Sequence, residues 1–424
     1  MIKLGKDNKS FERNGAPFFW LADTVWSAFT NATLDEWRLY LDVRKKQGFN
    51  TLQINILPQW DRSVRDEIVH PFSIDKNTST YVISKHNPVY FEHARKMVQM
   101  AKEQGFEVAL VLFWCSYIPD TWADKIKRTV LIKLEDVNEY TELVSSYFSA
   151  FDPIYIISGD TDFEAEKTSD YYEASLNRIK KLAPNCLTTL HIRGRLSDLP
   201  QKLQENPGLD FYVYQSGHNS LFPDCAWQLA EVFSAKQPIK PVINMEPCYE
   251  MMGYSRNIYG RFSRFDVRKA AWQSVLSGAR AGITYGAHGV WSWHHADSAF
   301  GETVGEGFLR PFTWHDALHF KGAWDCAFIK EIFDQYKLYD IEPRPLADGM
   351  PEQIRYARND DLAVIYSPYA RDLVLREENE VADVTIIDLE ERKIGRIDHT
   401  SDGNVCRISM PVFPGDCLYI VKFK

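Results

Sequence analysis

The feature that most constrains the fold of this chain is a regular alternation of short apolar segments with longer amphipathic ones. Apolar runs rich in β-branched and aromatic residues indicate buried strands, and apolar residues at a helical spacing indicate helices. Strands are expected at 18–23, 49–57, 106–115, 154–158, 187–191, 210–214, 241–244 and 283–286. Eight such strand–helix units predict an α/β protein with a (β/α)₈ (TIM) barrel.

The segments between these strands predict helices. They are expected at 33–47, 89–104, 137–149, 171–182, 196–204, 226–235 and 267–280, with a long closing helix at 316–336. Thr33 and Glu36 have the spacing of a capping box, and Gly48 follows as a helix stop. A doubly wound open sheet could also alternate in this way, but it usually has a glycine-rich turn after its first strand. This chain has Asp23-Thr24-Val25-Trp26 there, which favours the barrel.

The pattern changes after residue 338. Short strands without intervening helices are expected at 354–357, 362–366, 384–388, 407–410 and 417–421. Closely spaced strands separated by polar turns predict a small all-β sandwich. We therefore divide the chain into a catalytic barrel, residues 1–338, and a C-terminal β-sandwich domain, residues 339–424, which is expected to pack on the barrel as a structural unit.

The composition argues against several classes of protein. The net charge of −9 disfavours a nucleic-acid-binding protein, which needs a concentrated basic surface. No apolar run approaches about 18 residues, so no membrane-spanning helix is expected. The 7 cysteines are dispersed without metal-ligand spacing, which predicts free thiols. The first residues contain no hydrophobic leader, which predicts a cytoplasmic protein, or a periplasmic or secreted one whose leader has been removed.

Two carboxylates directly follow predicted strands, Asp160 after the fourth and Glu246 after the seventh. Barrel enzymes place their reactive groups at the carboxyl ends of the strands, and strands four and seven lie on opposite sides of the barrel mouth. Each carboxylate alone could instead cap a helix or pair with an arginine. Together they can flank a glycosidic bond, one donating a proton and the other facing the anomeric carbon. The sequence therefore predicts a glycoside hydrolase with Asp160 and Glu246 as catalytic residues; Glu250 is the alternative to Glu246.

Further polar and aromatic residues lie at or just beyond the predicted strand ends. Carboxylates, amides and imidazoles can bind sugar hydroxyl groups, whereas aromatic rings can pack on the apolar faces of sugars. We expect a carbohydrate-binding pocket lined by Asp23, Asn55, Trp60, Trp114, His191, Tyr214, His218, Glu250, His288 and Trp291.

Two other functions stay open at this point. His191, His218 and His288 end strands five, six and eight, as in metal-dependent amidohydrolase barrels. Those barrels also need a His-x-His pair on the first strand, where this chain has Leu21-Ala22-Asp23, so neither a metal nor another cofactor is expected. The other alternative is a carbohydrate-binding barrel without catalytic activity.

Several segments resemble a known family. Residues 15–26 (GAPFFWLADTVW) and 48–53 (GFNTLQ) resemble the opening of the apiosidase-like glycosidases, glycoside hydrolase family 140. Gly159-Asp160 and residues 246–250 (EPCYE) resemble that family's two catalytic segments, and the β-rich C-terminal region is similar to its second domain. Related barrels typically have Asn-Glu at the end of the fourth strand, and this chain departs from that pattern.

The resemblance implies a retaining mechanism in which Asp160 is the acid/base and Glu246 the nucleophile. Retaining enzymes hold these two carboxyl groups about 5–5.5 Å apart. The resemblance also implies a substrate that is a plant-type or complex glycan, with apiose as the suggested sugar. The sequence leaves open the sugar and linkage, exo or endo action, and the oligomeric state.

Overall fold

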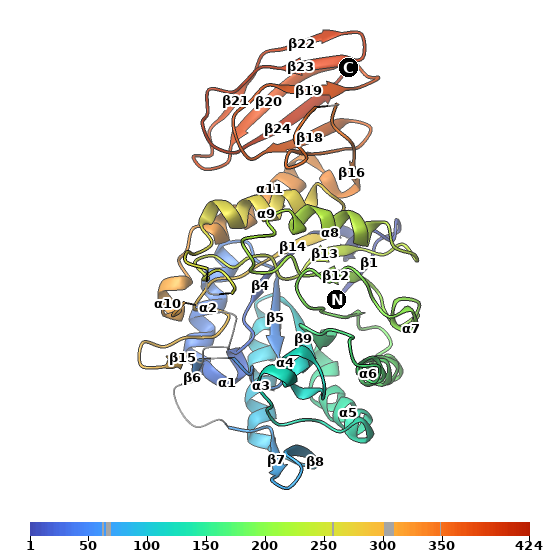
Figure 1. Ribbon diagram of the computed structural model, residues 1–424, viewed down its shortest axis with the longest axis vertical. Coiled ribbons are helices and arrows are strands. Elements are labelled where there is room, and N and C mark those ends of the chain that lie inside the picture. The colour runs from blue at the N-terminus through green and yellow to red at the C-terminus, as the bar shows by residue number, and fades with distance from the viewer. Residues whose placement is uncertain (62, 65–68, 257, 301–308, 348) are drawn as a thin grey trace.

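The computed structural model describes residues 1–424 except 62, 65–68, 257, 301–308 and 348. Its N-terminal part contains a parallel sheet surrounded by helices, and an antiparallel β domain follows (Figure 1). The sheet strands are β4 (Trp20–Thr24), β5 (Thr51–Asn55), β9 (Glu107–Trp114), β10 (Ile154–Gly159), β11 (Thr188–Thr189), β12 (Tyr212–Tyr214), β13 (Val242–Asn244) and β14 (Gly282–Tyr285). These strands confirm the predicted (β/α)₈ barrel.

The barrel strands pair in the order β11-β10-β9-β5-β4-β14-β13-β12, and neighbouring strands are parallel. β11 and β12 therefore stand at the two ends of the ladder. The gap between them is bridged by the N–H of Asp210, which donates to the Thr188 carbonyl at 3.0 Å. The Thr189 hydroxyl also donates to the Phe211 carbonyl at 2.7 Å. These bonds close the barrel between β11 and β12.

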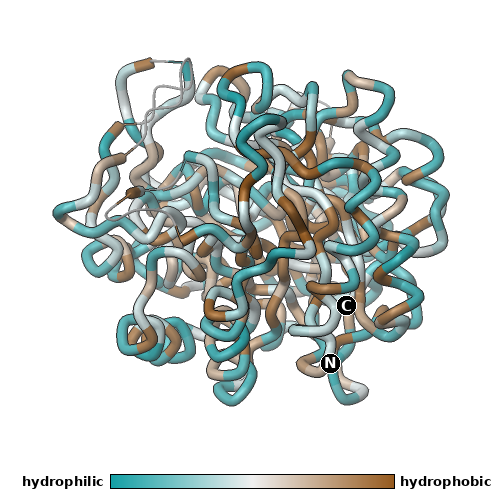
Figure 2. Tube along the Cα trace, turned by 90° about the horizontal axis from the view of Figure 1, so that it is seen from below, coloured by the Kyte–Doolittle hydropathy of each residue, from teal (hydrophilic) through white to brown (hydrophobic). Residues whose placement is uncertain are grey.

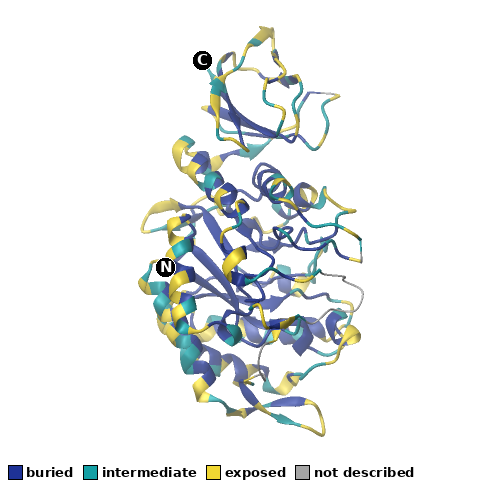
Figure 3. Cartoon of the chain, turned by 90° about the vertical axis from the view of Figure 1, so that its left-hand side faces the viewer, coloured by how far each residue is buried: buried dark blue, intermediate teal, exposed yellow. Residues whose placement is uncertain are grey.

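The helices cover the outside of the sheet, so that the strands are buried and the outer faces of the helices are exposed (Figure 3). They are α1 (Ala28–Asn31), α2 (Leu34–Lys46), α3 (Pro88–Glu103), α4 (Trp122–Ile126), α5 (Val137–Phe148), α6 (Thr168–Leu182), α7 (Gln201–Gln204), α8 (Cys225–Ser234), α9 (Arg264–Val275), α10 (Trp314–Ala317) and α11 (Gly322–Tyr336). The predicted capping box is confirmed, because Thr33 and Glu36 each bond the other's backbone N–H.

Two predicted helices differ from the structure. The helix expected at 196–204 is reduced to α7, because Pro200 disfavours helical geometry in the residue before it. The closing helix expected at 316–336 is broken between α10 and α11. The break leaves the N–H of Gly322, the first residue of α11, without a helical partner, and this N–H donates to Glu250 Oε2 at 2.9 Å.

Elements that the sequence did not predict close the bottom of the barrel and extend one loop. The strands β1 (Ile2–Leu4), β2 (Phe11–Arg13) and β3 (Ala16–Phe18) form a small antiparallel sheet. The Phe11 ring lies 5.2 Å from Phe211 and 6.2 Å from Trp20, at the amino ends of β12 and β4. A hairpin follows β5, made of β7 (Phe72–Asp75) and β8 (Thr80–His86), and β6 (Ser63–Val64) pairs with β15 (Ala299–Phe300).

The C-terminal region is a β-sandwich, as predicted. One antiparallel sheet has the order β16 (Glu342–Pro343), β17 (Arg355–Arg358), β18 (Leu362–Ser367), β24 (Cys417–Phe423), β20 (Val381–Asp388) and β21 (Ile394–Arg396). The other has the order β19 (Leu373–Arg376), β23 (Val405–Ile408) and β22 (His399–Asp402). Buried side chains such as Ile365, Leu375 and Tyr419 form its core.

The distribution of hydrophobic residues agrees with this architecture. In the Cα trace seen from below, apolar segments concentrate in the interior of the barrel and polar segments lie outside (Figure 2). All seven cysteines are free, as their dispersed spacing predicted. In the part of the chain that the structure describes, no helix has both the length and the apolar character needed to cross a bilayer.

Buried ion pairs join the sandwich to the barrel. Arg268 on α9 donates from Nε to Asp416 Oδ2 of the sandwich at 2.8 Å, and from Nη1 to Asp325 Oδ2 on α11 at 2.9 Å. Arg264 and Arg392 bind the same Asp325 carboxylate. Because Asp325 and Asp416 are buried, their charges depend on these arginines for compensation.

We expect Arg268→Ala to destabilise the protein by about 3 kcal/mol, because it leaves the buried Asp416 carboxylate without its arginine. Urea denaturation followed by tryptophan fluorescence measures this change. Arg38→Ala is the matched control, since Arg38 forms a solvent-exposed pair with Asp35 and exposed pairs contribute little. Equal unfolding midpoints for the two variants would contradict the importance of the buried network.

Candidate active site

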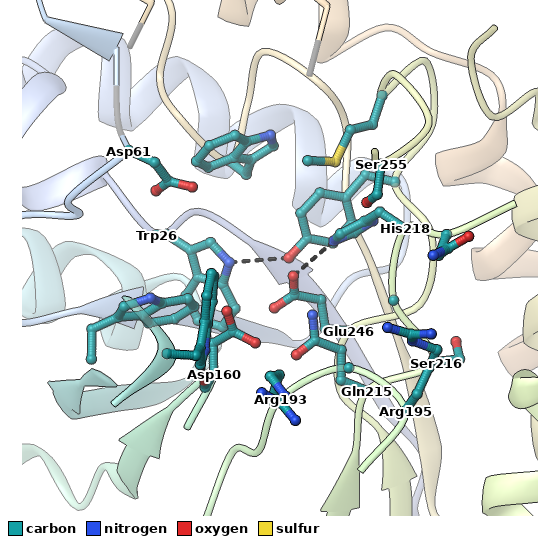
Figure 4. A pocket seen from close by; sticks show the side chains of 18 of the residues that line it. Trp26, Asp61, Asp160, Arg193, Arg195, Gln215, Ser216, His218, Glu246 and Ser255 are labelled. Atoms are coloured by element: carbon teal, nitrogen blue, oxygen red, sulfur yellow. Dashed lines mark hydrogen bonds and ion pairs between the residues drawn. The ribbon is translucent and has the colours of Figure 1, made fainter. Parts of the chain in front are cut away.

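A cavity of about 290 Å³ lies at the carboxyl ends of the barrel strands (Figure 4). Its lining combines indole rings with groups of both charges. The indoles are those of Trp26, Trp60, Trp114, Trp122 and Trp291; the carboxylates are Asp61, Asp160 and Glu246; and the guanidinium groups are Arg193, Arg195 and Arg256. Flat rings beside hydrogen-bonding groups suit a ligand that has apolar faces and many hydroxyl groups.

Glu246 lies two residues beyond β13, and its side chain points into the cavity (Figure 4). His218 Nε2 is 2.8 Å from Glu246 Oε1, and His191 Nε2 is 3.2 Å from Oε2. Burial by itself raises the pKa of this carboxyl, but its contacts with His191 and His218 outweigh burial and lower the pKa to about 2. Glu246 is therefore ionised at neutral pH.

The His191 ring connects the two candidate catalytic residues. Its Nδ1 lies 2.8 Å from the backbone nitrogen of Asp160. A backbone N–H can only donate, so Nδ1 accepts and the proton of a neutral ring is on Nε2, which faces Glu246. His191 thus holds the Asp160 backbone on one side and directs an N–H towards the Glu246 carboxylate on the other.

Asp160 directly follows β10 in a left-handed backbone conformation, with φ of 48°. Aspartate adopts this conformation more readily than most residues, and here both neighbouring backbone groups are held. Its N–H bonds His191, and its carbonyl accepts from Trp122 Nε1 at 2.6 Å. The preceding residue must be glycine, because a Cβ at Gly159 would overlap the Trp114 indole. The glycine of the Gly-Asp pair, which stands where related barrels typically have asparagine, therefore follows from the packing of Trp114.

Aromatic side chains hold one another in place around the two carboxylates. The Trp26 and Trp114 rings meet edge to face at 5.3 Å, and Trp114 stacks on His191 at 5.8 Å. Trp26 Nε1 donates to the Tyr249 hydroxyl at 3.0 Å. Such mutually packed rings give the pocket rigid walls, which preorganise it for a ligand.

The structure brings together part of the predicted site. Asp160, Glu246, Trp60, Trp114, His218 and Trp291 line the cavity, and His191 contacts Glu246. The other predicted residues, contrary to the expectation, lie away from the lining: Asp23, Asn55, Tyr214, Glu250 and His288.

Two of the residues away from the lining are carboxylates that face the helices. Asp23 is fully buried and accepts from Arg44 Nε at 2.6 Å and from the Tyr40 hydroxyl at 2.7 Å. Glu250 Oε2 accepts from the Tyr285 hydroxyl at 2.6 Å as well as from Gly322, and burial raises its pKa. Both groups bind neighbouring helices or strands, so a structural role explains them.

The remaining three residues are also bound to the protein. The Tyr214 hydroxyl donates to the Ala226 carbonyl at 2.7 Å on α8. His288 Nε2 lies 2.6 Å from the Leu309 carbonyl, and burial lowers the pKa of this imidazole to about 3. Asn55 donates to Gln59, which itself lines the cavity. Asn55 therefore supports the pocket through Gln59.

Several lining residues fall outside the set expected from the sequence, including Trp26, Asp61, Trp122 and the three arginines. Trp122 begins α4, and the others lie in loops, where no periodic pattern indicates the direction of a side chain. Trp26 is two residues beyond β4, and Asp61 is six beyond β5. Extending the search from the strand ends to about six residues beyond them would have included both.

The described residues do not form a cluster of metal ligands. Within them, no group of three or more histidine, cysteine, aspartate or glutamate side chains is placed to hold a metal ion. His191 and His218 both contact Glu246, whereas His288 contacts the chain near Leu309. The three histidines at the strand ends therefore do not converge on one point: two contact Glu246, and the third contacts the Leu309 carbonyl.

A (β/α)₈ barrel with carboxylates after strands four and seven, both in one aromatic pocket, is typical of glycoside hydrolases. The family model described as "Apiosidase-like, catalytic domain" matches residues 6–340. The chain belongs to this family, and it is a glycosidase. No curated protein matches it significantly.

Solved structures share the complete fold. A structure named as a glycoside hydrolase is 20% identical, with a TM-score of 0.83, and the match covers 100% of this chain and 97% of the other. A family 5 glycoside hydrolase from Bacteroides vulgatus is 21% identical, with a TM-score of 0.83 and coverage of 100% and 93%. A family 30 endoxylanase from Clostridium papyrosolvens is 11% identical, with a TM-score of 0.51 and coverage of 95% and 96%.

Proposed function

We propose that this glycosidase cleaves an O-glycosidic bond of a plant-type or complex glycan with retention of configuration, and that Glu246 is the nucleophile and Asp160 the acid/base. The observation that carries the proposal is the pair of imidazoles on Glu246, which keeps its carboxylate ionised in a pocket that Asp160 also lines. A nucleophile must be ionised to attack, so this environment suits that role.

In the proposed reaction, Glu246 attacks the anomeric carbon while Asp160 donates a proton to the departing oxygen. The bond between the anomeric carbon and that oxygen breaks as the ester to Glu246 forms. Water then attacks the anomeric carbon, Asp160 takes a proton from it, and Glu246 leaves as a carboxylate. His191 keeps both groups in place, because it contacts the Asp160 backbone and the Glu246 side chain.

The family supports apiose as the first sugar to test, and the indole-lined cavity supports a carbohydrate ligand. A panel of aryl glycosides and plant glycans that includes apiosides identifies the accepted sugar. We expect hydrolysis of at least one member. A chain that turned over none of them but bound a sugar would instead be a carbohydrate-binding barrel.

The stereochemistry of the product tests the mechanism. We expect the first-formed sugar to have the same anomeric configuration as the substrate, because two displacements at one carbon restore it. Proton NMR of the reaction in its first minutes, before the anomers equilibrate, distinguishes the two outcomes. Product of the opposite configuration would mean that water attacks directly and that Glu246 is not a nucleophile.

Chelation tests the metal-dependent alternative. We expect activity in excess EDTA to equal activity in its absence, because the proposed chemistry uses only carboxyl groups of the protein. Loss of activity that zinc or another divalent ion restored would favour a metal-dependent hydrolase.

A further inference from the structure

The cavity contains a third carboxylate, Asp61, that the proposed mechanism does not use. It enters from the loop after β5, and its side chain lies across the pocket from Arg193 and Arg195 (Figure 4). Beyond the effect of burial, Glu246 raises the pKa of Asp61 and His218 lowers it, so Asp61 is electrostatically linked to both residues across the cavity that all three line.

A relay of two amides holds Asp61. Gln59 Nε2 donates to Asp61 Oδ1 at 2.8 Å, and Asn55 Nδ2 donates to Gln59 Oε1. An ionised carboxylate can only accept, so Gln59 must present its NH₂ group to Asp61 and its oxygen to Asn55. Asn55 ends β5, so the relay fixes the carboxylate relative to a barrel strand.

The surroundings of Asp61 do not explain it as a structural residue. In the described part of the chain no lysine or arginine forms an ion pair with it, and Gln59 is its one side-chain hydrogen-bond donor. An ionised carboxylate has about four acceptor positions, so it can accept further hydrogen bonds from a ligand in the cavity. Asp23, in contrast, is fully buried away from the cavity and pairs with Arg44 and Tyr40 through Oδ2.

We propose that Asp61 binds hydroxyl groups of the sugar whose glycosidic bond is cleaved, and that it selects sugars with two neighbouring free hydroxyl groups on the ring edge that faces it. The nucleophile faces the anomeric carbon of that same sugar, so the glycone occupies the cavity that Asp61 lines together with Glu246. A carboxylate matches two adjacent hydroxyl donors, one for each oxygen. This inference rests on the proposed function of the pocket.

The charge state of Asp61 agrees with this role. Burial raises its pKa to about 6, and Glu246 adds to the increase, whereas Gln59 and His218 oppose it. Above that pH Asp61 is a charged acceptor, and below it the carboxyl is neutral and binds hydroxyl groups less strongly. Among the described residues, the titratable and charged groups around it are Glu246, His218 and Cys115, and Asp160, Arg193 and Arg195 line the same cavity.

Deoxy sugars test the proposal directly. For the best aryl glycoside in the panel, each analogue lacking one glycone hydroxyl is compared in the wild type and in Asp61→Asn. We expect Asp61→Asn to lower kcat/KM for the parent about 10- to 100-fold. With the analogue that lacks a hydroxyl bound by Asp61, the kcat/KM of the wild type should fall by a similar factor relative to the parent substrate. The kcat/KM of Asp61→Asn should differ little between the parent and that analogue. Asp35→Asn, the same change at an exposed site, is the control and should leave kcat/KM unchanged for both the parent and the deoxy analogue.

The acidic limb of kcat/KM near pH 6 should also disappear in Asp61→Asn, which a merely structural role would not produce. A wild type that hydrolysed every deoxy analogue as well as the parent would overturn the inference, and this measurement does not depend on the variant's folding. Titration with free monosaccharides and their deoxy forms, followed by tryptophan fluorescence, reports binding without turnover. Binding that Asp61→Asn weakens without any hydrolysis would contradict the proposed function alone.

Discussion

Replacement of Glu246 by alanine should abolish hydrolysis of all substrate types, with turnover falling about 10⁴-fold or more. In the part of the chain that the structure describes, the other carboxylates near the site have separate places: Asp160 is needed for proton transfer, Asp61 is held by Gln59, and Glu250 is bound to Tyr285 and Gly322 outside the pocket. Steady-state kinetics with both an activated aryl glycoside and a natural-type substrate measures the loss. An activated fluoro-sugar should label the wild-type peptide that contains Glu246.

The control for this variant is Glu250→Gln, because Glu250 is the residue that the sequence offered as the alternative nucleophile. We expect it to lower stability, because Glu250 holds the start of α11, while retaining most of the turnover per folded molecule. If Glu246→Ala kept near-normal turnover and Glu250→Gln lost it, the nucleophile would be misassigned. The glycosidase fold and family would be unaffected by that result.

Replacement of Asp160 by alanine should have an effect that depends on the leaving group. Substrates with poor leaving groups need the proton and should slow about 10²- to 10⁴-fold, whereas activated aryl glycosides depart without it and should form the glycosyl-enzyme at a near-normal rate. Hydrolysis of that intermediate still needs a base, so azide, which needs none, should restore turnover. The product should then be a glycosyl azide with the configuration of the substrate.

Rates plotted against the pKa of the leaving group measure this dependence for the wild type and the variant. The variant should show a steep slope and the wild type a shallow one. Equal losses for good and poor leaving groups, with no response to azide, would contradict the acid/base role. The left-handed backbone of Asp160 is also available to asparagine, so Asp160→Asn tests the role with less disturbance of the loop.

Much of the fold could be predicted from local sequence. β9 is buried along its whole length because it is part of a parallel sheet covered by helices, and its continuous apolar run reflects that burial. The helix start at Thr33 follows from the bonding needs of the first turn, which neighbouring residues satisfy. Asp160 and Glu246 were found because a barrel gathers the residues that follow its strands.

Other features depend on contacts that the sequence does not show. The barrel is closed between β11 and β12 by bonds made just before β12, so strands five and six are shorter than predicted. At the break before α11, the Gly322 N–H bonds Glu250, a partner 72 residues away, which a local pattern cannot indicate. The N-terminal sheet is held by Phe11 against the amino ends of barrel strands, which a local pattern cannot indicate.

The sequence by itself determined the barrel, the sandwich, the family resemblance and the strand ends where the chemistry should lie, because these follow from periodic burial and short motifs. Only the tertiary structure decided which polar residues face the cavity. Asp23 lies near the end of β4 and Asp160 directly follows β10, yet Asp23 turns to Arg44 and Asp160 to the pocket. Successive strand residues point to opposite faces, so a shift of one residue reverses the direction of a side chain. Asp61 lies in a loop, where only three-dimensional packing sets that direction.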